Sequence, residues 1–162
     1  MILSELSPLN LLQLTGKILE ELQERKIIST SNAPLGDYAE WLYRESYGWN
    51  AAGNSAKDYD AIDTKNIKYR IKARRVHSRN KSRQLGALRR LDEGNFDVLV
   101  AVLFNDDFTV MRAALIPHAV VVKEAKWVKA TNSWRFILRD SVWDYDEVRD
   151  CTSILGQIQE QS

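Results

Sequence analysis

The segment 96–104, with the sequence FDVLVAVLF, is the feature that most constrains the fold. Apolar residues fill it almost continuously, and such a run is typical of a strand that is buried on both faces of a sheet. A sheet of this kind needs helices or loops to cover it on both sides. Helix and strand signals lie on both sides of this segment. We therefore expect an α/β protein with a mixed central β-sheet flanked by helices.

The helix signals begin near the N-terminus. Ser7 followed by Pro8 is a typical helix start, because a hydroxyl can cap the first turn and proline suits the first helical position. A rough apolar stripe continues from there through the first 26 residues. Asp37 is a candidate N-cap for a second helix that runs through Arg44. We expect a helix over 82–91, a helical or irregular segment from Pro117 through about Val128, and a terminal helix over 146–159.

The strand signals include a hairpin. Residues 58–63 and 68–72 alternate at period two, and Asn66 between them suits a left-handed turn position. A turn at 105–107 and a partner strand over 108–116 follow the buried run. We expect one more strand over 134–138.

The charges are strongly segregated along the chain, although the net charge is only +1. Eleven of the 23 Lys and Arg residues fall within 65–90, which contains no Asp or Glu. Residues 1–64 and 91–162 are both acidic on balance. Such a basic block favours binding to a polyanion. The alternatives are a solvated basic face, or a strip that meets an acidic partner or the acidic flank of a second copy.

Several side chains of the basic block suit contacts with nucleic acid. Arginine and lysine neutralise phosphates, and polar side chains on a loop also reach base edges. We expect DNA as the partner, with RNA as an open alternative. The candidate nucleic-acid-binding residues are Arg70, Arg74, Arg75, Arg79, Lys81, Arg83 and Gln84.

The predicted hairpin also brings an aspartate and a lysine together. Asp60 and Asp58 are expected on one face of the first strand, and Lys72 on the second strand. An aspartate can hold a divalent cation, and a lysine can orient water and counter charge on a phosphate. Glu40, on the preceding helix, can add a ligand. The alternatives are a cross-strand ion pair between Asp60 and Lys72, and a helical pair of Glu40 with Arg44.

Three strings carry a resemblance to a known family: GDYAEWL (36–42), YDAID (59–63) and YRIKARR (69–75). With the element order over about 36–138, they resemble the PD-(D/E)XK nuclease superfamily, and more narrowly its uncharacterised bacterial members. The resemblance implies a restriction-endonuclease-like core and hydrolysis of DNA phosphodiester bonds with Mg²⁺ or Mn²⁺. Carried over, Glu40 is the helical acid, Asp60 the metal-binding aspartate and Lys72 the motif lysine.

One position departs from that family pattern. The motif acid should fall two residues before Lys72, where this chain has Arg70. Arginine has no lone pair for a metal, and its charge opposes a nearby cation. In a metal-dependent endonuclease, Asp58 or Glu40 would have to compensate. The alternative is a catalytically inactive nucleic-acid-binding module on the same fold, which needs no divalent ion.

The length of 162 residues favours a single domain. We divide it into an N-terminal helical extension (1–33), a nuclease-like core (36–138) and a C-terminal helical segment (139–162). The apolar stripe of the first helix also predicts a homodimer through it. The single cysteine, Cys151, and the lack of a long apolar run or a basic leader favour a reduced, cytoplasmic protein without a membrane partner.

Overall fold

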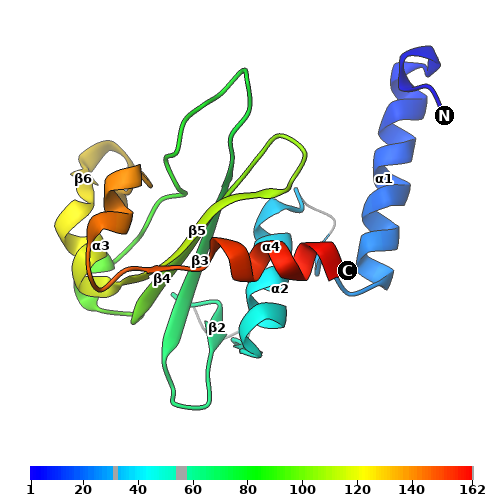
Figure 1. Cartoon of the computed structure of the whole chain (residues 1–162). Coiled ribbons are helices and arrows are strands. Elements are labelled where there is room, and N and C mark those ends of the chain that lie inside the picture. The colour runs from blue at the N-terminus through cyan, green and yellow to red at the C-terminus, as the bar shows by residue number, and fades with distance from the viewer. Residues whose placement is uncertain (31–32, 54–57, 162) are drawn as a thin grey trace.

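The computed structural model describes residues 1–30, 33–53 and 58–161 (Figure 1). Four 3₁₀ turns join its helices and strands. In chain order the elements are α1 (Pro8–Glu24), α2 (Leu35–Tyr47), β1 (Asn50–Ala51), β2 (Ala61–Ile62), β3 (Lys68–Arg75), β4 (Val98–Phe104), β5 (Val110–Pro117), α3 (His118–Glu124), β6 (Lys126–Val128), β7 (Ser133–Arg135), β8 (Arg149–Asp150) and α4 (Thr152–Gln161).

The main sheet has the strand order β1-β2-β3-β4-β5-β8. Strands β3 and β4 are parallel, and every other neighbouring pair is antiparallel. Strand β4 lies inside the sheet, and its residues from Leu99 to Phe104 are fully buried. The predicted α/β class, mixed sheet and buried strand are therefore confirmed. Strands β6 and β7 form a separate antiparallel pair.

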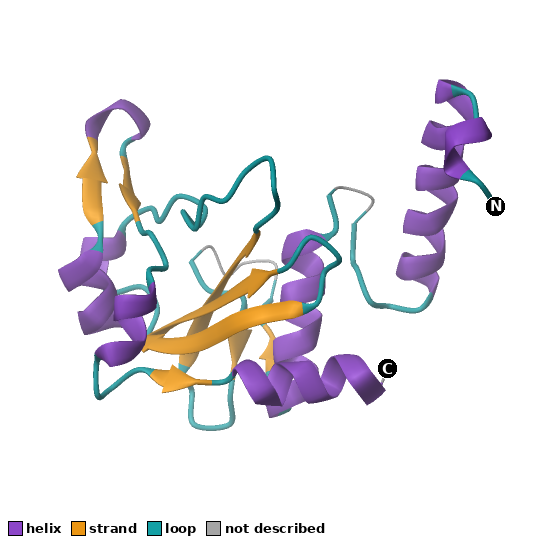
Figure 2. Cartoon of the chain, turned by 45° about the horizontal axis from the view of Figure 1, so that its top comes forward, coloured by secondary structure: helices purple, strands orange, loops and turns teal. Residues whose placement is uncertain are grey.

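Helices α2 and α4 cover one face of the main sheet (Figure 2). Helix α2 buries Ala39, Leu42 and Tyr43, because residues three and four apart share a helix face. The Tyr43 hydroxyl donates a hydrogen bond to the Ala101 carbonyl of β4 at 2.7 Å. A buried polar group with such a partner avoids a desolvation penalty and ties α2 to the sheet. Helix α2 therefore holds Glu40 at a defined position beside β3.

The opposite face is covered by an extended segment, so the helix predicted over 82–91 is wrong. The backbone N–H groups of Leu85 and Leu88 donate to the carbonyls of Phe136 and Trp134, each at 3.0 Å. Leu85, Leu88 and Leu91 are all buried, a spacing that an extended chain can also present to a core. The long-range hydrogen bonds thus select the extended form. The connection between parallel β3 and β4 contains no α-helix in consequence.

Helix α1 begins where the sequence predicts. The Ser7 side chain accepts a hydrogen bond from the Asn10 N–H at 3.2 Å, and Pro8 is the first helical residue. Along α1 no residue whose burial is described is buried, and Leu9 and Ile18 are exposed. Both views show α1 projecting beyond α2 and the sheet (Figures 1 and 2). A homodimer through this helix stays a prediction.

Of the helices described, none has the length and apolar character needed to cross a membrane.

Two helix boundaries differ from the predictions. Asp37 is not the N-cap of α2, which begins at Leu35 without a side-chain cap. The Asp37 carboxylate instead accepts hydrogen bonds from Ser29 and Thr30, which ties these two residues to the first turn of α2. The terminal helix starts at Thr152 and not at 146, because residues 149–150 pair with β5 as strand β8.

Candidate functional site

Asp60 lies beside β3, immediately before β2 begins. Strand β2 covers only Ala61 and Ile62, so β3 continues past its partner. The Ile71 N–H donates to Asp60 Oδ2 at 2.8 Å, and the Asp60 N–H donates to the Tyr69 carbonyl at 2.8 Å. These bonds hold the carboxylate against the edge of the sheet. The prediction that Asp58 and Asp60 share a strand face is wrong, since the strand begins after both.

Glu40 faces a cavity that also contains Asp60. This cavity, of about 700 Å³, is called the acidic pocket here, and its charged lining residues are Lys26, Asp37, Glu40, Arg44 and Asp60. Burial, and after it the charges of Asp60 and Asp37, together raise the pKa of Glu40 to about 7. The predicted helical pair is present, with Arg44 Nη1 at 3.7 Å from Glu40 Oε2. That ion pair lowers the pKa of Glu40 but does not offset burial.

Arg70 and Lys72 lie on the face of β3 that points away from α2. Side chains alternate along a strand, and Ile71 between them packs into the core under α2. They line a second cavity of about 310 Å³, called the cationic pocket here. Its lining residues are Asp58, Arg70, Lys72, Ala87, Leu88, Arg89, Arg90 and Phe96.

The Lys72 ammonium lies directly under the extended segment that covers this face. A Cβ added to Gly86 would stand 3.3 Å from Lys72 Nζ, so the missing side chain leaves room for the ammonium. Burial lowers the pKa of Lys72, the charges of Arg70 and Arg89 lower it further, and Asp60 opposes them.

A contact between Arg70 and Asp60 joins the two pockets. Arg70 Nη1 lies 3.7 Å from Asp60 Oδ1, so Asp60 has the guanidinium on one oxygen and the Ile71 N–H on the other. Asp58 has a different partner, because Arg90 Nη2 lies 2.6 and 2.7 Å from its two oxygens. Asp58 therefore lines the cationic pocket and is not brought to Glu40. The carboxylates that share a pocket with Asp60 are those of Glu40 and Asp37.

The acidic pocket contains carboxylates that could hold a divalent cation together with water. Among residues 1–30, 33–53 and 58–161, no three His, Cys, Asp or Glu side chains gather as a metal-holding group. Mg²⁺ commonly keeps several waters and is bound through one or two carboxylates and substrate phosphates. Glu40 and Asp60 fit that pattern, with Asp60 held in place by the backbone of β3.

Carboxylates from other parts of the chain balance some of the positive charge of the basic block (65–90). Arg75 Nη2 lies 3.3 Å from Asp106, and Arg83 Nη1 lies 2.6 Å from Asp140. The other predicted nucleic-acid-binding residues differ. Gln84 pairs through its backbone with Ile137, and no ion pair within the described part of the chain involves Arg74, Arg79 or Lys81. Arg79 and Lys81 lie on the loop after β3 that projects from the sheet in Figure 1.

Three site residues were not singled out from the sequence: Gly86, Arg89 and Arg90. They lie in the segment 82–91, which was expected to be helical. In the extended form, Arg89 donates to the Thr131 carbonyl at 3.2 Å and lines the cationic pocket with Arg90. The Arg89-Arg90 doublet within the basic block was the only sequence signal for them.

The chain matches no model of a known protein family, and no curated protein matches it in sequence.

Proposed function

We propose that the protein binds DNA and hydrolyses its phosphodiester bonds with the help of Mg²⁺ or Mn²⁺, on a restriction-endonuclease-like fold. The observation that supports this is the position of Asp60 between two groups of opposite chemistry. Its charge raises the pKa of Glu40 in the acidic pocket and opposes the lowering of the pKa of Lys72 in the cationic pocket. Carboxylates beside a lysine are the groups that phosphoryl transfer with a metal requires.

Each residue then has a separate task. Glu40 and Asp60 would hold the divalent cation, which when bound supplies Lewis acidity and a more acidic water. Lys72 places an ammonium where charge develops on the phosphate, and electrostatic stabilisation of that charge is commonly a large part of catalysis. Arg70 contacts phosphate oxygens and does not serve as a metal ligand, because a guanidinium has no lone pair to offer.

The second candidate is a nucleic-acid-binding module without hydrolysis. It is favoured by the 3.7 Å approach of Arg70 Nη1 to Asp60 Oδ1, where a guanidinium already balances the carboxylate. A cation bound by Asp60 would have to displace that contact or tolerate its charge. In this case the basic residues of β3 and its following loop bind phosphates, and binding needs no divalent ion.

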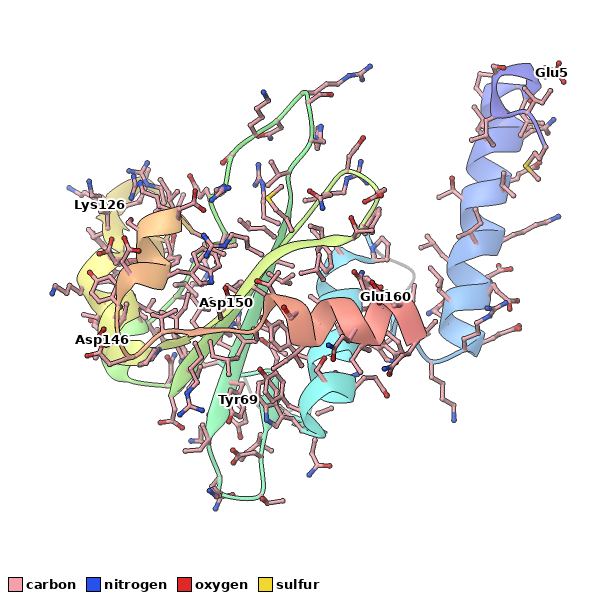
Figure 3. The ribbon with its side chains drawn as sticks, in the orientation of Figure 1. Glu5, Tyr69, Lys126, Asp146, Asp150 and Glu160 are labelled. Atoms are coloured by element: carbon pink, nitrogen blue, oxygen red, sulfur yellow. The ribbon has the colours of Figure 1, made fainter. Side chains whose placement is uncertain are left out.

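A plasmid-nicking assay with Mg²⁺ or Mn²⁺ separates the two candidates. It compares wild type with Glu40→Gln, Asp60→Asn and Lys72→Met, on plasmid, linear and branched DNA and on RNA. Asp146→Asn is the matched control, because Asp146 is an exposed carboxylate near α3 (Figure 3). We expect wild type and the control to cleave, and each site variant to lose about 100-fold or more.

Equal cleavage by all five proteins would contradict the proposal, because the activity would then come from another site or a contaminant. Loss of cleavage in every protein, with salt-sensitive DNA binding intact in wild type, would favour the module.

A further inference from the structure

The cationic pocket holds more positive charge than its own carboxylate balances. Four cations line it, and Asp58 is its single acidic residue. Arg90 is paired with Asp58 and Arg70 lies 3.7 Å from Asp60, which leaves Lys72 and Arg89 without a carboxylate partner among the described residues. Arg89 donates to a backbone carbonyl, and Lys72 has no hydrogen-bond or ion-pair partner in the described part of the chain. Like charges gathered in a half-buried space repel one another unless an anion joins them.

The cationic pocket is also covered by a segment of the chain, which is called its roof here. The segment containing Gly86 crosses over Lys72, and hydrogen bonds from Leu85 and Leu88 to the strand region around β7 hold it on both sides of that glycine. Both leucine side chains are buried, so the roof is part of the core. Only a small group fits beneath it. A volume of about 310 Å³ accommodates a phosphate with part of a nucleoside, at the lower end of ligand-pocket sizes.

We propose that the cationic pocket binds a terminal phosphate, the phosphomonoester at the end of a nucleic acid strand. A phosphomonoester carries close to two negative charges and three acceptor oxygens, which suits two guanidinium groups and an ammonium. The choice of a nucleic acid as the source of the phosphate rests on the proposed function, whereas phosphate recognition by the pocket does not.

The test measures binding without hydrolysis, in EDTA and at fixed ionic strength. Oligonucleotides that differ only in a 5′-phosphate, a 3′-phosphate or a hydroxyl end are labelled away from that end and titrated by fluorescence anisotropy. We expect one phosphorylated end to bind about tenfold more tightly than the hydroxyl end, which corresponds to ~1.4 kcal/mol. Arg89→Gln should remove that preference, and Gly86→Ala should reduce it, because a Cβ 3.3 Å from Lys72 Nζ makes the ammonium shift by a few tenths of an ångström.

Two matched controls accompany these variants. Arg74→Gln removes a cation of β3 outside the pocket and should weaken binding to both kinds of end alike. Gly36→Ala adds a methyl group where nothing lies within 4 Å, and it should keep the preference. The unfolding curves of all four variants show whether each is folded before its binding is compared.

Equal affinity of wild type for phosphate and hydroxyl ends overturns the proposal, as does a preference that neither Arg89→Gln nor Gly86→Ala lowers. If no oligonucleotide binds, the proposed function fails, and thermal unfolding with inorganic phosphate or AMP decides about the pocket. Stabilisation of wild type but not of Arg89→Gln would support a phosphate pocket for free phosphate or nucleotides. No stabilisation of wild type would overturn it.

Discussion

The acidic and cationic pockets lie on the two sides of β3 and differ in the sign of their excess charge. Three carboxylates and two cations line the first, while four cations and one carboxylate line the second. Alternation along β3 places Arg70 and Lys72 away from α2, and α2 supplies Glu40 on the other side. The comparison teaches that one strand can separate two pockets of opposite excess charge, because alternation places Arg70 and Lys72 on the same face.

Burial acts on the two pockets in opposite directions. It raises the pKa of Glu40 and lowers the pKa of Lys72, because in each case the charged form loses hydration. The contact between Arg70 and Asp60 is where the two meet. A ligand of opposite sign would relieve each pocket, which agrees with the proposals of a divalent cation on one side and a phosphate on the other.

The largest expected effect comes from breaking the roof of the cationic pocket. Leu88→Ala should lower the free energy of unfolding by about 2–4 kcal/mol, because it leaves a cavity beside a fully packed core. Urea unfolding measures this, with Leu9→Ala on the exposed face of α1 as the control, expected within about 0.5 kcal/mol of wild type. A loss below about 1 kcal/mol would mean that the roof is loosely packed and the pocket open.

The next effect concerns the acidic pocket and depends on pH. The pKa of Glu40 is raised from 4.5 to about 7, so the unfolded chain loses this proton at lower pH than the folded protein does. The stability of wild type should therefore fall, relative to Glu40→Gln, as pH rises from about 4.5 to about 7. Because the side chain is partly exposed, we expect a difference of about 2 kcal/mol above that range. Parallel pH profiles of urea unfolding would contradict the buried position of Glu40.

A charge reversal at Arg70 should make the two pockets alike. Arg70→Glu places a carboxylate beside Asp60 where a guanidinium stood, so divalent cations should bind about tenfold more tightly, or ~1.4 kcal/mol. Titration calorimetry with Mn²⁺ measures this. Arg74→Glu controls for the added charge, because Arg74 lies four residues after Arg70 on the same face of β3. Equal gains in the two variants would show that Asp60 is not the local metal ligand.

The smallest expected effect concerns the basic residues outside both pockets. Arg74→Gln should reduce the slope of log affinity for duplex DNA against log salt by ~0.9, the value for one lost phosphate contact. Lys126→Gln, an exposed position on β6 (Figure 3), should leave the slope unchanged. Identical slopes for Arg74→Gln and wild type would remove Arg74 from the DNA-binding surface.

The features that the sequence predicted well depend on neighbouring residues. Asn66 adopts a φ of 62° in the turn before β3, and Ser7 with Pro8 starts α1, because both are local choices of the backbone. The residue types of the candidate site, Glu40, Asp60 and Lys72, were likewise recognisable from their strings. Their contacts were not, since Asp60 faces Arg70 and Asp58 is taken up by Arg90.

By itself, then, the sequence determined the buried strand, the start of α1, the hairpin turn and the residue types of the candidate site. Only the tertiary structure decided that 82–91 is extended, because its hydrogen-bond partners lie near residues 134 and 136. It also decided which cations have no carboxylate partner and can bind a ligand. Arg75, Arg90 and Arg83 each contact a carboxylate, at separations of 31, 32 and 57 residues along the chain. Local patterns carry backbone preference and side-chain chemistry, whereas pairing across such separations depends on how the whole chain packs.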